Sequence, residues 1–346
     1  QRVQRISDLS VFIACRQELN EIQQKHVRRI AELSKFDLET QLVQEFPELQ
    51  GLMGENYAML KNEEAVVCRG IRQHYYPRNA KDFLPEDVES VPEALAYKLD
   101  LLTTSFSLNR IPSGAADPYA LRRTAQGITQ LILGLRLPLD LQELISAAVR
   151  LLDDQQDLAL DRTKLQNDLL DFLLQRQRWF LQERGIRYDL IDAVLKTSAG
   201  IQSAQGKTAR SVLAIEQLSL AEFLGEHLET DMFKRSVEAI VRAANISSKY
   251  GGRIAEELNE AALELTEEKA FLAALQPILN SDSQALWSPD NYLQQLRKIE
   301  PVVTRFFEDV MVMDEDPVKC GNRLWLCQRL AQWSGRHLDL QSIVFA

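Results

Sequence analysis

The stretch DMFKRSVEAIVRAANISSKYG (residues 231–251) decides the fold class of this chain. Its apolar residues recur at i, i+3, i+4 and i+7, which places them on one face of an α-helix. The same period is present in DLQELISAAVRLLDD (140–154) and QNDLLDFLLQRQRWFLQERG (166–185). Gly185 and Gly251 follow two of these helices as expected C-caps. Because no segment of convincing length alternates as a strand does, we predict an all-α protein.

The length of the chain, together with its Pro-, Gly- and Ser-rich loop and its polar stretch, divides it into three predicted regions. At 346 residues the chain exceeds the usual size of a single hydrophobic core. The first region (1–135) ends in a loop rich in Pro, Gly and Ser that leads into a helix. The second region (136–210) ends in a polar stretch, and the third (211–346) is expected to form a helical bundle. Most of the eleven prolines, Pro277 and Pro301 among them, are expected between helices.

The composition is that of an ordinary soluble globular protein, with 45% hydrophobic and 26% charged residues. No run approaches 18 apolar residues, and the first residues lack the apolar core of a signal peptide. The chain begins with Gln, so we expect it to be a fragment of a longer protein. A net charge of −10 argues against bulk capture of nucleic acid, but a local basic face is compatible with RNA binding because salt screens distant charges.

The cysteines indicate a reducing environment. Cys15, Cys68, Cys320 and Cys327 are widely spread, without a C-x-x-C pair or a histidine at zinc-ligand spacing. We interpret them as buried free thiols, which is typical of the cytoplasm or an organelle stroma.

Two motifs that would indicate an enzyme are incomplete. AGIQSAQGKTA (199–209) has five residues between Gly200 and Gly206, where a phosphate-binding loop has four, and the segment before it is predicted to be helical. No Gly-x-Ser-x-Gly motif is present, and neither His227 nor His337 has an evident nucleophilic partner. We therefore predict no catalytic residue in this chain.

A metal-dependent phosphohydrolase of the HD type would need histidines and aspartates that converge on one ion. The first region contains only His26 and His74, and it has Phe36-Asp37 where an adjacent His-Asp pair is required. Phenylalanine cannot bind a metal, so we predict no metal ligands.

A basic stripe is predicted on the helix that opened this section. Arg235, Arg242 and Lys249 are spaced by seven residues, close to two helical turns, and Asn245 borders them. Cations with a neighbouring amide suit the phosphates and unpaired bases of RNA. A solvated helix surface without a ligand is the alternative.

A second basic cluster surrounds the loop that ends the first region. In DPYALRRTAQG, Asp117 can cap a helix with Pro118 at its first position, and Arg122 and Arg123 follow. Arg110 and Lys98 precede the loop. Phosphate contact and ordinary surface charge fit this spacing equally well.

Several longer motifs resemble one protein family, the β subunit of the bacterial-type heterotetrameric glycine–tRNA ligase. The matching motifs follow the order of that family over nearly the whole chain. They are EFPELQGLMGENYA (45–58), HYYPR (74–78), ALAYKLDLL (94–102), IPSGAADPYALRR (111–123), VRAANIS (241–247) and FFEDVMVMDEDPVKCGNRLWLCQRL (306–330).

The resemblance implies the C-terminal half of such a subunit. Its parts would be an HD-like helical domain (1–135), a helical linker (136–210) and an anticodon-binding helical bundle (211–346). In this family the α subunit activates glycine with ATP and Mg, and the β subunit recognises the tRNA. The implied partners are glycine tRNA and the α subunit in an α2β2 heterotetramer in the cytoplasm, with neither DNA nor a membrane. No cofactor is expected in this chain itself.

The family context assigns the two basic surfaces to the tRNA. The basic stripe (Arg235, Arg242, Asn245 and Lys249) is predicted to contact the anticodon arm, with Arg323 and Arg329 as secondary contacts. The remaining tRNA contacts, with its acceptor end as one candidate, are predicted at Arg78, Lys98, Arg110, Arg122 and Arg123.

The first region departs from true HD hydrolases at the metal positions. Besides Phe36, Tyr97 stands where the family more often has Asp, although Asp100 remains. We therefore expect a scaffold or an RNA-contacting surface. The break FPELQGLMG (46–54) is interpreted as a corner between helices rather than a catalytic loop, with Pro47 opening a helix and the glycines allowing close packing or positive φ.

Two alternative functions remain open at this stage. One is an independent HD-type phosphohydrolase, which stoichiometric metal and turnover would reveal. The other is an assembly scaffold for the α subunit with little RNA contact of its own.

Overall fold

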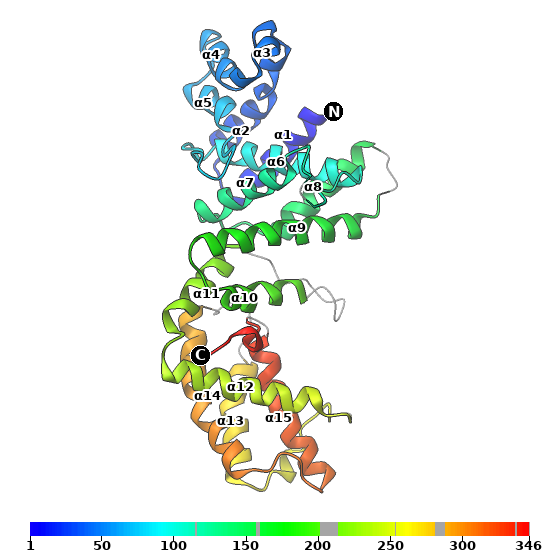
Figure 1. Ribbon diagram of the computed structural model, residues 1–346, viewed down its shortest axis with the longest axis vertical. Coiled ribbons are helices and arrows are strands. Elements are labelled where there is room, and N and C mark those ends of the chain that lie inside the picture. Colours follow the sequence, from blue (N-terminus) through cyan, green and yellow to red (C-terminus); the bar gives the residue numbers. More distant parts are fainter. Residues whose placement is uncertain are drawn as a thin grey trace. The chain divides into compact units, whose positions relative to one another are not determined.

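The computed structural model describes residues 1–114, 116–156, 160–200, 214–252, 254–280, 288–335 and 338–345. Within these ranges the chain consists of α-helices, short 3-10 helices and loops, and its only β feature is an isolated bridge between Ser113 and Ala116 (Figure 1). The all-α prediction is confirmed. None of the described helices combines the length and the apolar composition needed to cross a membrane.

The helices form two compact units. The first comprises the described residues of Gln1–Arg184 together with the beginning of α11 (Ala214–His227), and the second comprises α10 (Tyr188–Gly200) and the described residues of Ser219–Ala346. The three regions predicted from the sequence, with limits near 135 and 210, stay predictions.

The first unit is built around one central helix, α6 (Ser90–Ser107). This helix packs against α1, α2, α5, α7, α8 and α9. The consecutive residues Ala94, Leu95 and Ala96 point to different sides of this helix and are all buried, as expected for a helix inside a core. The other helices of the unit are α1 (Arg2–Arg16), α2 (Glu21–Leu33), α3 (Gln41–Glu45), α4 (Leu52–Leu60), α5 (Ala65–Gln73), α7 (Leu121–Gly134), α8 (Leu141–Gln156) and α9 (Arg162–Glu183).

The break at residues 46–54 is a corner, as predicted. Pro47 opens a short 3-10 helix (Pro47–Leu49), and Gly51 then adopts a φ of 78° immediately before α4. The buried Asp37 fixes the corner, since its Oδ2 accepts hydrogen bonds from the backbone N–H of Gly51 at 2.6 Å and of Gly54 at 3.2 Å. A Cβ atom on Gly54 would lie 2.7 Å from Cγ2 of Ile71, so the packing requires glycine there.

The second unit is a helical bundle with an aromatic centre. Phe233, Phe271 and Phe306 are fully buried, and the rings of Phe271 and Phe306 meet edge to face with centroids 5.0 Å apart. Its central helix, α12, packs against α14 and α15, and α13 packs against the same two. Its main helices are α12 (Asp231–Lys249), α13 (Thr266–Asn280), α14 (Pro289–Asp309) and α15 (Pro317–Gly335).

Two details of the helix pattern differ from the sequence prediction. Pro277 and Pro301 lie inside α13 and α14 rather than between helices. Each lacks an N–H for the helical ladder, but buried residues on both sides, such as Ile299 and Val303 around Pro301, hold the helix in place. The glycine expected to end α9 behaves as predicted, because Gly185 adopts a φ of 80° just after the helix.

The cysteines are free, as predicted. Cys68, Cys320 and Cys327 are buried, whereas Cys15 is exposed, so the expectation that all four are buried was wrong at this position. Cys15 faces solvent because Ile13 and Ala14 are the residues that point into the core at this end of α1.

Candidate nucleic-acid interface

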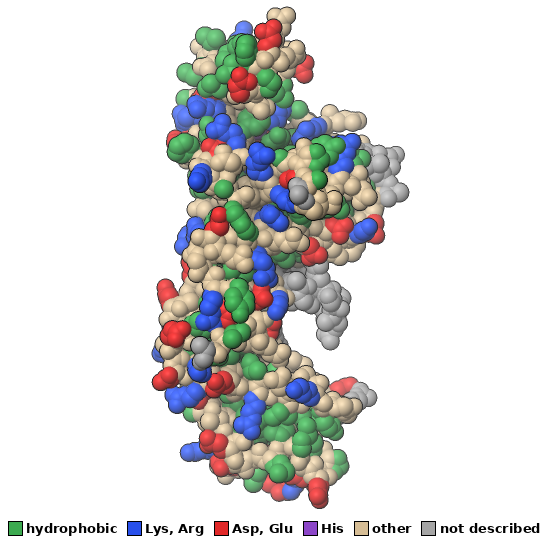
Figure 2. All heavy atoms as spheres, viewed as in Figure 1, with side chains coloured by type: hydrophobic (Ala, Val, Ile, Leu, Met, Phe, Trp, Pro, Cys, Tyr) green, Lys and Arg blue, Asp and Glu red, His purple; other side chains and the backbone are tan. Residues whose placement is uncertain are grey.

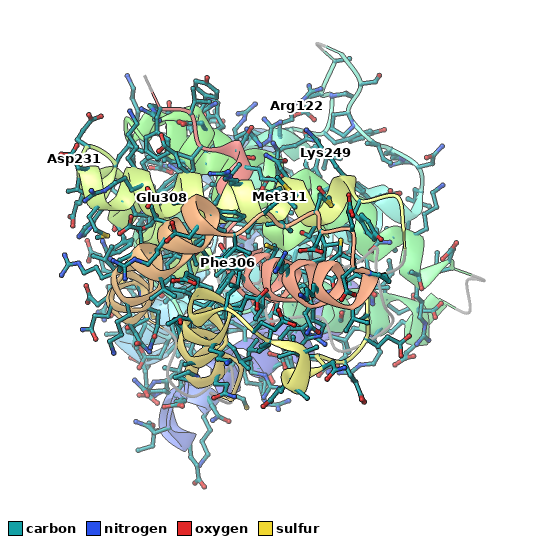
Figure 3. All side chains as sticks on the ribbon, turned by 90° about the horizontal axis from the view of Figure 1, so that it is seen from below. Arg122, Asp231, Lys249, Phe306, Glu308 and Met311 are labelled. Atoms are coloured by element: carbon teal, nitrogen blue, oxygen red, sulfur yellow. The ribbon has the colours of Figure 1, made fainter. Side chains whose placement is uncertain are left out.

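The basic stripe lies on the exposed face of α12. Arg235, Arg242, Asn245 and Lys249 are all exposed, while Phe233, Val237 and Ile240 turn the opposite face toward the core. The helix therefore displays its cations because its apolar side is anchored. Figure 3 shows α12 running between the labelled Asp231 and Lys249.

Two members of the stripe have neighbours that shape their charge. The Nε of Arg235 lies 4.0 Å from Oε1 of Glu300, and the side chain of Arg235 is 64% exposed. The guanidinium of Arg242 lies over the ring of Phe307, 4.6 Å from its centroid. Such an exposed ion pair and cation–π contact each contribute little to stability, so both guanidinium groups are available to a ligand.

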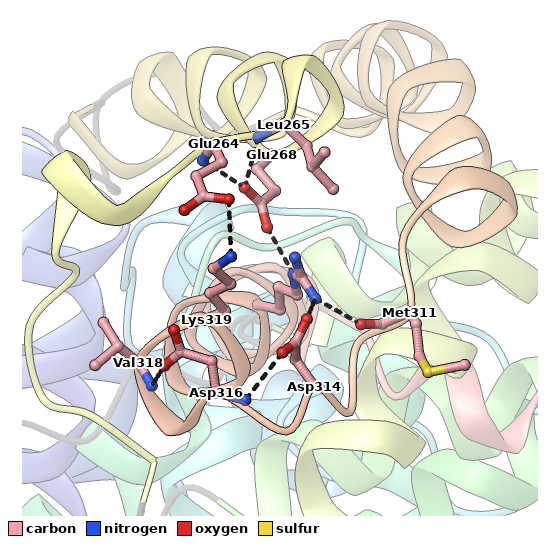
Figure 4. Close-up of polar contacts among 9 residues, drawn as sticks. Glu264, Leu265, Glu268, Met311, Asp314, Asp316, Val318 and Lys319 are labelled. Atoms are coloured by element: carbon pink, nitrogen blue, oxygen red, sulfur yellow. Dashed lines mark hydrogen bonds and ion pairs between the residues drawn. The ribbon is translucent and has the colours of Figure 1, made fainter.

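Arg323, predicted as a secondary contact, is buried. Its Nε lies 2.6 Å from Oε1 of Glu268, and its Nη1 donates to Oδ2 of Asp314 at 2.7 Å and to the carbonyl of Met311 at 2.8 Å (Figure 4). The placement of Arg323 at the surface was therefore wrong. Its guanidinium holds the loop after α14 against α13 and α15.

Arg329, the other secondary contact, lies half-buried on the same helix. Its Nη2 donates to the carbonyl of Glu256 at 3.4 Å, and its Nη1 donates to Oε1 of Gln332 at 3.2 Å. The guanidinium also lies over the Trp325 ring, 5.0 Å from its centroid. Arg329 therefore lines the surface without being freely mobile.

The structure does not place all predicted members of the second basic cluster at the surface. Lys98 is buried, and its Nζ donates to the carbonyls of His74, Tyr75 and Tyr76 at 3.3, 3.3 and 2.8 Å. Burial lowers the pKa of Lys98 to about 7. Its predicted surface position was wrong because its Nζ turns inward to the carbonyl groups of residues 74–76, which directly follow α5.

Arg122 serves the loop that precedes α7. The Nη2 of Arg122, which is labelled in Figure 3, donates to the carbonyl of Gly114 at 2.6 Å, and its Nη1 donates to that of Ala116 at 3.3 Å. Asp117 accepts from the backbone N–H groups of Leu121 and Arg122 at 2.8 and 3.0 Å and so binds the first turn of α7. The prediction that Asp117 is the N-cap with Pro118 as the first helical residue was wrong, because α7 begins at Leu121 and Ala120 is its N-cap. These bonds order the loop and leave Arg123 and Arg110 as its exposed cations.

The structure adds an aromatic residue that the sequence reasoning did not single out. Tyr119 is 48% exposed, and the guanidinium of Arg110 lies over its ring, 5.1 Å from the centroid. Such a pair offers both stacking and charge to single-stranded nucleic acid. Arg78 also lies at the surface, but its Nε is bound to Oδ2 of Asp82 at 2.8 Å.

A lysine lies inside the region that the sequence predicts to be HD-like. The Nζ of Lys35 lies 2.6 Å from Nε2 of His74, and 3.9 and 3.7 Å from the ring centroids of Tyr75 and Tyr97. Burial lowers the pKa of Lys35 to about 7, and burial together with the Lys35 charge lowers the pKa of His74. Burial likewise raises the pKa of Glu93 to about 7.

Two carboxylates of this region, those of Asp37 and Asp100, bind protein groups. Asp37 binds the amides of the corner, and Asp100 accepts from Nε of Arg5 at 2.7 Å and from Nε of Arg2 at 3.0 Å. Over the described ranges, no group of three or more His, Cys, Asp or Glu side chains is placed to hold a metal ion.

The remaining sequence candidates are structural or lie outside the description. His26 contacts Glu64, and Nδ1 of His227 lies 3.0 Å from the carbonyl of Phe223. His337 and most of the AGIQSAQGKTA segment fall outside the described residues.

Comparison with known proteins identifies the family. Residues 1–196 match the model of the glycyl-tRNA synthetase beta subunit. The chain belongs to this family. The resemblance inferred from the motifs is thereby confirmed. Residues 237–341 also match the DALR anticodon binding domain.

Relatives from this family align over almost the full length of the chain. The glycine–tRNA ligase beta subunit of Halalkalibacterium halodurans is 35% identical over 347 residues, which cover 99% of this chain and 48% of that protein. Those of Desulfitobacterium hafniense and Bacillus subtilis are 36% and 33% identical, covering 94% and 93% of this chain and 45% and 44% of each relative. The chain thus spans about half the length of the curated relatives it matches.

The basic stripe of this beta chain lies mostly within the matched anticodon binding domain, since Arg242, Asn245 and Lys249 fall inside residues 237–341. Figure 2 shows lysine and arginine side chains mixed with acidic ones over the visible face, rather than gathered in one large patch. Any nucleic-acid contact is therefore expected at local groups of cations, consistent with the net charge of −10.

Proposed function

We propose that this chain is the tRNA-recognition part of a glycine–tRNA ligase β subunit, and that its second unit binds the anticodon arm of glycine tRNA. The observation that carries the proposal is the exposed basic stripe on α12. Arg323 of the same unit is engaged in internal bonds, whereas the stripe points its cations and the Asn245 amide toward solvent. Phosphates and unpaired bases are the ligands that such groups recognise.

The first unit contributes a second proposed contact surface. Arg110, Tyr119 and Arg123 are exposed on or next to a loop whose backbone is fixed by Asp117 and Arg122. We assign these three residues to another part of the tRNA, with its acceptor end as the candidate. Arg78 can join them once a phosphate competes with Asp82 for its guanidinium.

The chemistry of the reaction belongs to a partner in this proposal. Glycine activation with ATP and Mg is assigned to the α subunit, in an α2β2 heterotetramer in the cytoplasm. The chain itself is proposed to be non-catalytic and without a cofactor. In support, two carboxylates of its HD-like region, those of Asp37 and Asp100, bind backbone amides and arginines, and the side chain of Lys35 lies beside His74 inside that region.

The experiment compares tRNA affinity of the full-length β subunit, with its α subunit, before and after removal of two stripe cations. The Arg235→Ala/Arg242→Ala variant should bind glycine tRNA at least about tenfold more weakly, because two charge-assisted hydrogen-bonding groups are removed. The matched control Lys25→Ala/Arg28→Ala removes the same charge from exposed positions of α2. Equal affinities of the wild type and the stripe variant would reject the stripe and favour the assembly-scaffold alternative.

A further inference from the structure

A polar pocket opens at the end of α12, directly after the last residue of the basic stripe. Its volume is about 510 Å3, within the ~300–1,000 Å3 of small-ligand sites. The last turn of α12, the described residues of 250–256 and the second half of α15 form the walls. Ser247, Tyr250, Gln328, Arg329 and Gln332 are the lining residues used below.

The lining carries the paired donors and acceptors that read the edge of a base. Each glutamine amide offers two N–H donors and one acceptor oxygen. In the described part of the chain the Gln328 amide has no protein partner, and Gln332 uses its Oε1 to accept from Arg329 at 3.2 Å, which leaves its NH2 group for a ligand. The pocket therefore presents neutral hydrogen-bonding groups to a ligand.

The cation in the pocket wall is already bound within the protein. The guanidinium of Arg329 donates to the carbonyl of Glu256 and lies over Trp325, so its position is fixed at the wall. A neutral, planar group with polar edges does not need a free cation there.

Tyr250 supplies an aromatic wall. It is the C-cap of α12, is half-buried and packs against the hydrophobic core of the unit, so its ring is held in place. Unpaired bases of RNA stack on such aromatic side chains while their edges form hydrogen bonds. The pocket combines both kinds of contact within one site.

We propose that this pocket takes one unpaired nucleobase of the anticodon loop. The base stacks on Tyr250, and Gln328 and Gln332 read its edge, while the stripe holds the neighbouring phosphates. This assignment rests on the proposed function, in which the second unit binds the anticodon arm.

The test is a cycle that changes protein and RNA together in the complete α and β assembly. Affinity is measured for intact glycine tRNA and for transcripts in which each anticodon-loop nucleotide in turn is made abasic. The wild type should lose about tenfold at one position, in keeping with the ~1–3 kcal/mol of a read base. Gln328→Ala/Gln332→Ala should bind intact tRNA about tenfold more weakly and lose its sensitivity to that position.

The controls separate the pocket from the wider proposal. Gln294→Ala/Gln295→Ala on α14 should keep the wild-type affinity for intact tRNA and the wild-type loss of affinity for the abasic transcripts. Tyr250→Phe should also keep the wild-type affinity, because the phenylalanine ring can still stack on the base. If the double pocket variant fails to fold, the single variant Gln332→Ala, which changes an exposed position, replaces it in the same comparison with the abasic transcripts. A pocket variant that responds to every abasic site as the wild type does would overturn the pocket while leaving tRNA binding intact. Absence of tRNA binding by the wild type would instead remove the proposed function and the pocket together.

Discussion

The Nε of Arg323 lies 2.6 Å from Oε1 of Glu268, and both side chains are almost completely excluded from solvent. The pair joins α15 to α13. Glu268 also accepts from the backbone N–H groups of Glu264 and Leu265, and Arg323 holds Asp314, so each charge is satisfied on several sides. The Arg323 guanidinium thus stabilises the bundle that carries the basic stripe, and it takes no part in the proposed RNA contact.

Arg323→Met should destabilise the second unit by about 3–5 kcal/mol, because the Glu268 carboxylate would stay buried without its partner. Urea unfolding measures the change. Arg329→Met, on the same helix but half-buried, should cost far less. Arg323→Met/Glu268→Leu should cost less than the sum of its single changes, and strict additivity would show that the pair is not coupled.

Asp37→Ala should destabilise the first unit by about 2–3 kcal/mol, since the N–H groups of Gly51 and Gly54 would be left without their acceptor inside the protein. Chemical denaturation of the variant measures this cost. Glu39→Ala, a nearby exposed change, should stay within about 0.5 kcal/mol. A stable Asp37→Ala protein would mean that the corner does not depend on this carboxylate.

Lys98 predicts a pH dependence of stability. Its pKa is lowered to about 7 in the folded chain, so between pH 7 and its ordinary value near 10.5 the unfolded chain binds more protons. Stability from this group should therefore rise with pH across that window, by at most about 1.4 kcal/mol per pH unit. Replacing Lys98 by Met should remove this rise in unfolding curves at pH 7, 8 and 9, whereas exposed Lys25→Met should not. Parallel pH profiles of wild type and Lys98→Met would contradict the assignment.

The exposed ring of Tyr119 leads us to predict that base stacking on the first unit contributes to tRNA affinity. Tyr119→Ala should weaken glycine tRNA binding by about 1–3 kcal/mol if a base stacks on the ring, and Tyr119→Phe should retain most of the affinity. Tyr188→Ala, an exposed tyrosine of the second unit, is the matched control. Binding measurements in which the alanine and phenylalanine variants behave alike would assign any loss to something other than stacking.

Sequence periodicity was sufficient to predict the helices, because the apolar faces that α9 and α12 bury have the residue spacing seen in the sequence. It could not place Pro277 and Pro301, because a helix interrupted by proline survives only where tertiary packing supports it. Periodicity tells which face a residue is on, not what the neighbouring helices bring against that face.

The candidate site shows the same limit. The exposure of the stripe followed from the amphipathic pattern of α12, so Arg235, Arg242 and Lys249 were placed correctly at the surface. Lys98 and Arg323 were misplaced because their partners, the carbonyls after α5 and the Glu268 carboxylate, are brought to them by folding. A nearby acid in the sequence does not reveal such a partner, since Arg323 and Glu268 are 55 positions apart.

A salt titration of glycine tRNA binding tests the central claim most directly, with wild type and Arg235→Ala/Arg242→Ala compared in the full assembly. The wild-type affinity should fall steeply as salt rises, and the logarithmic slope of the variant should be shallower by about 0.7–0.9 for each phosphate that it no longer neutralises. Equal slopes for the two proteins, or an affinity that does not change with salt, would contradict electrostatic binding of the tRNA by the α12 stripe.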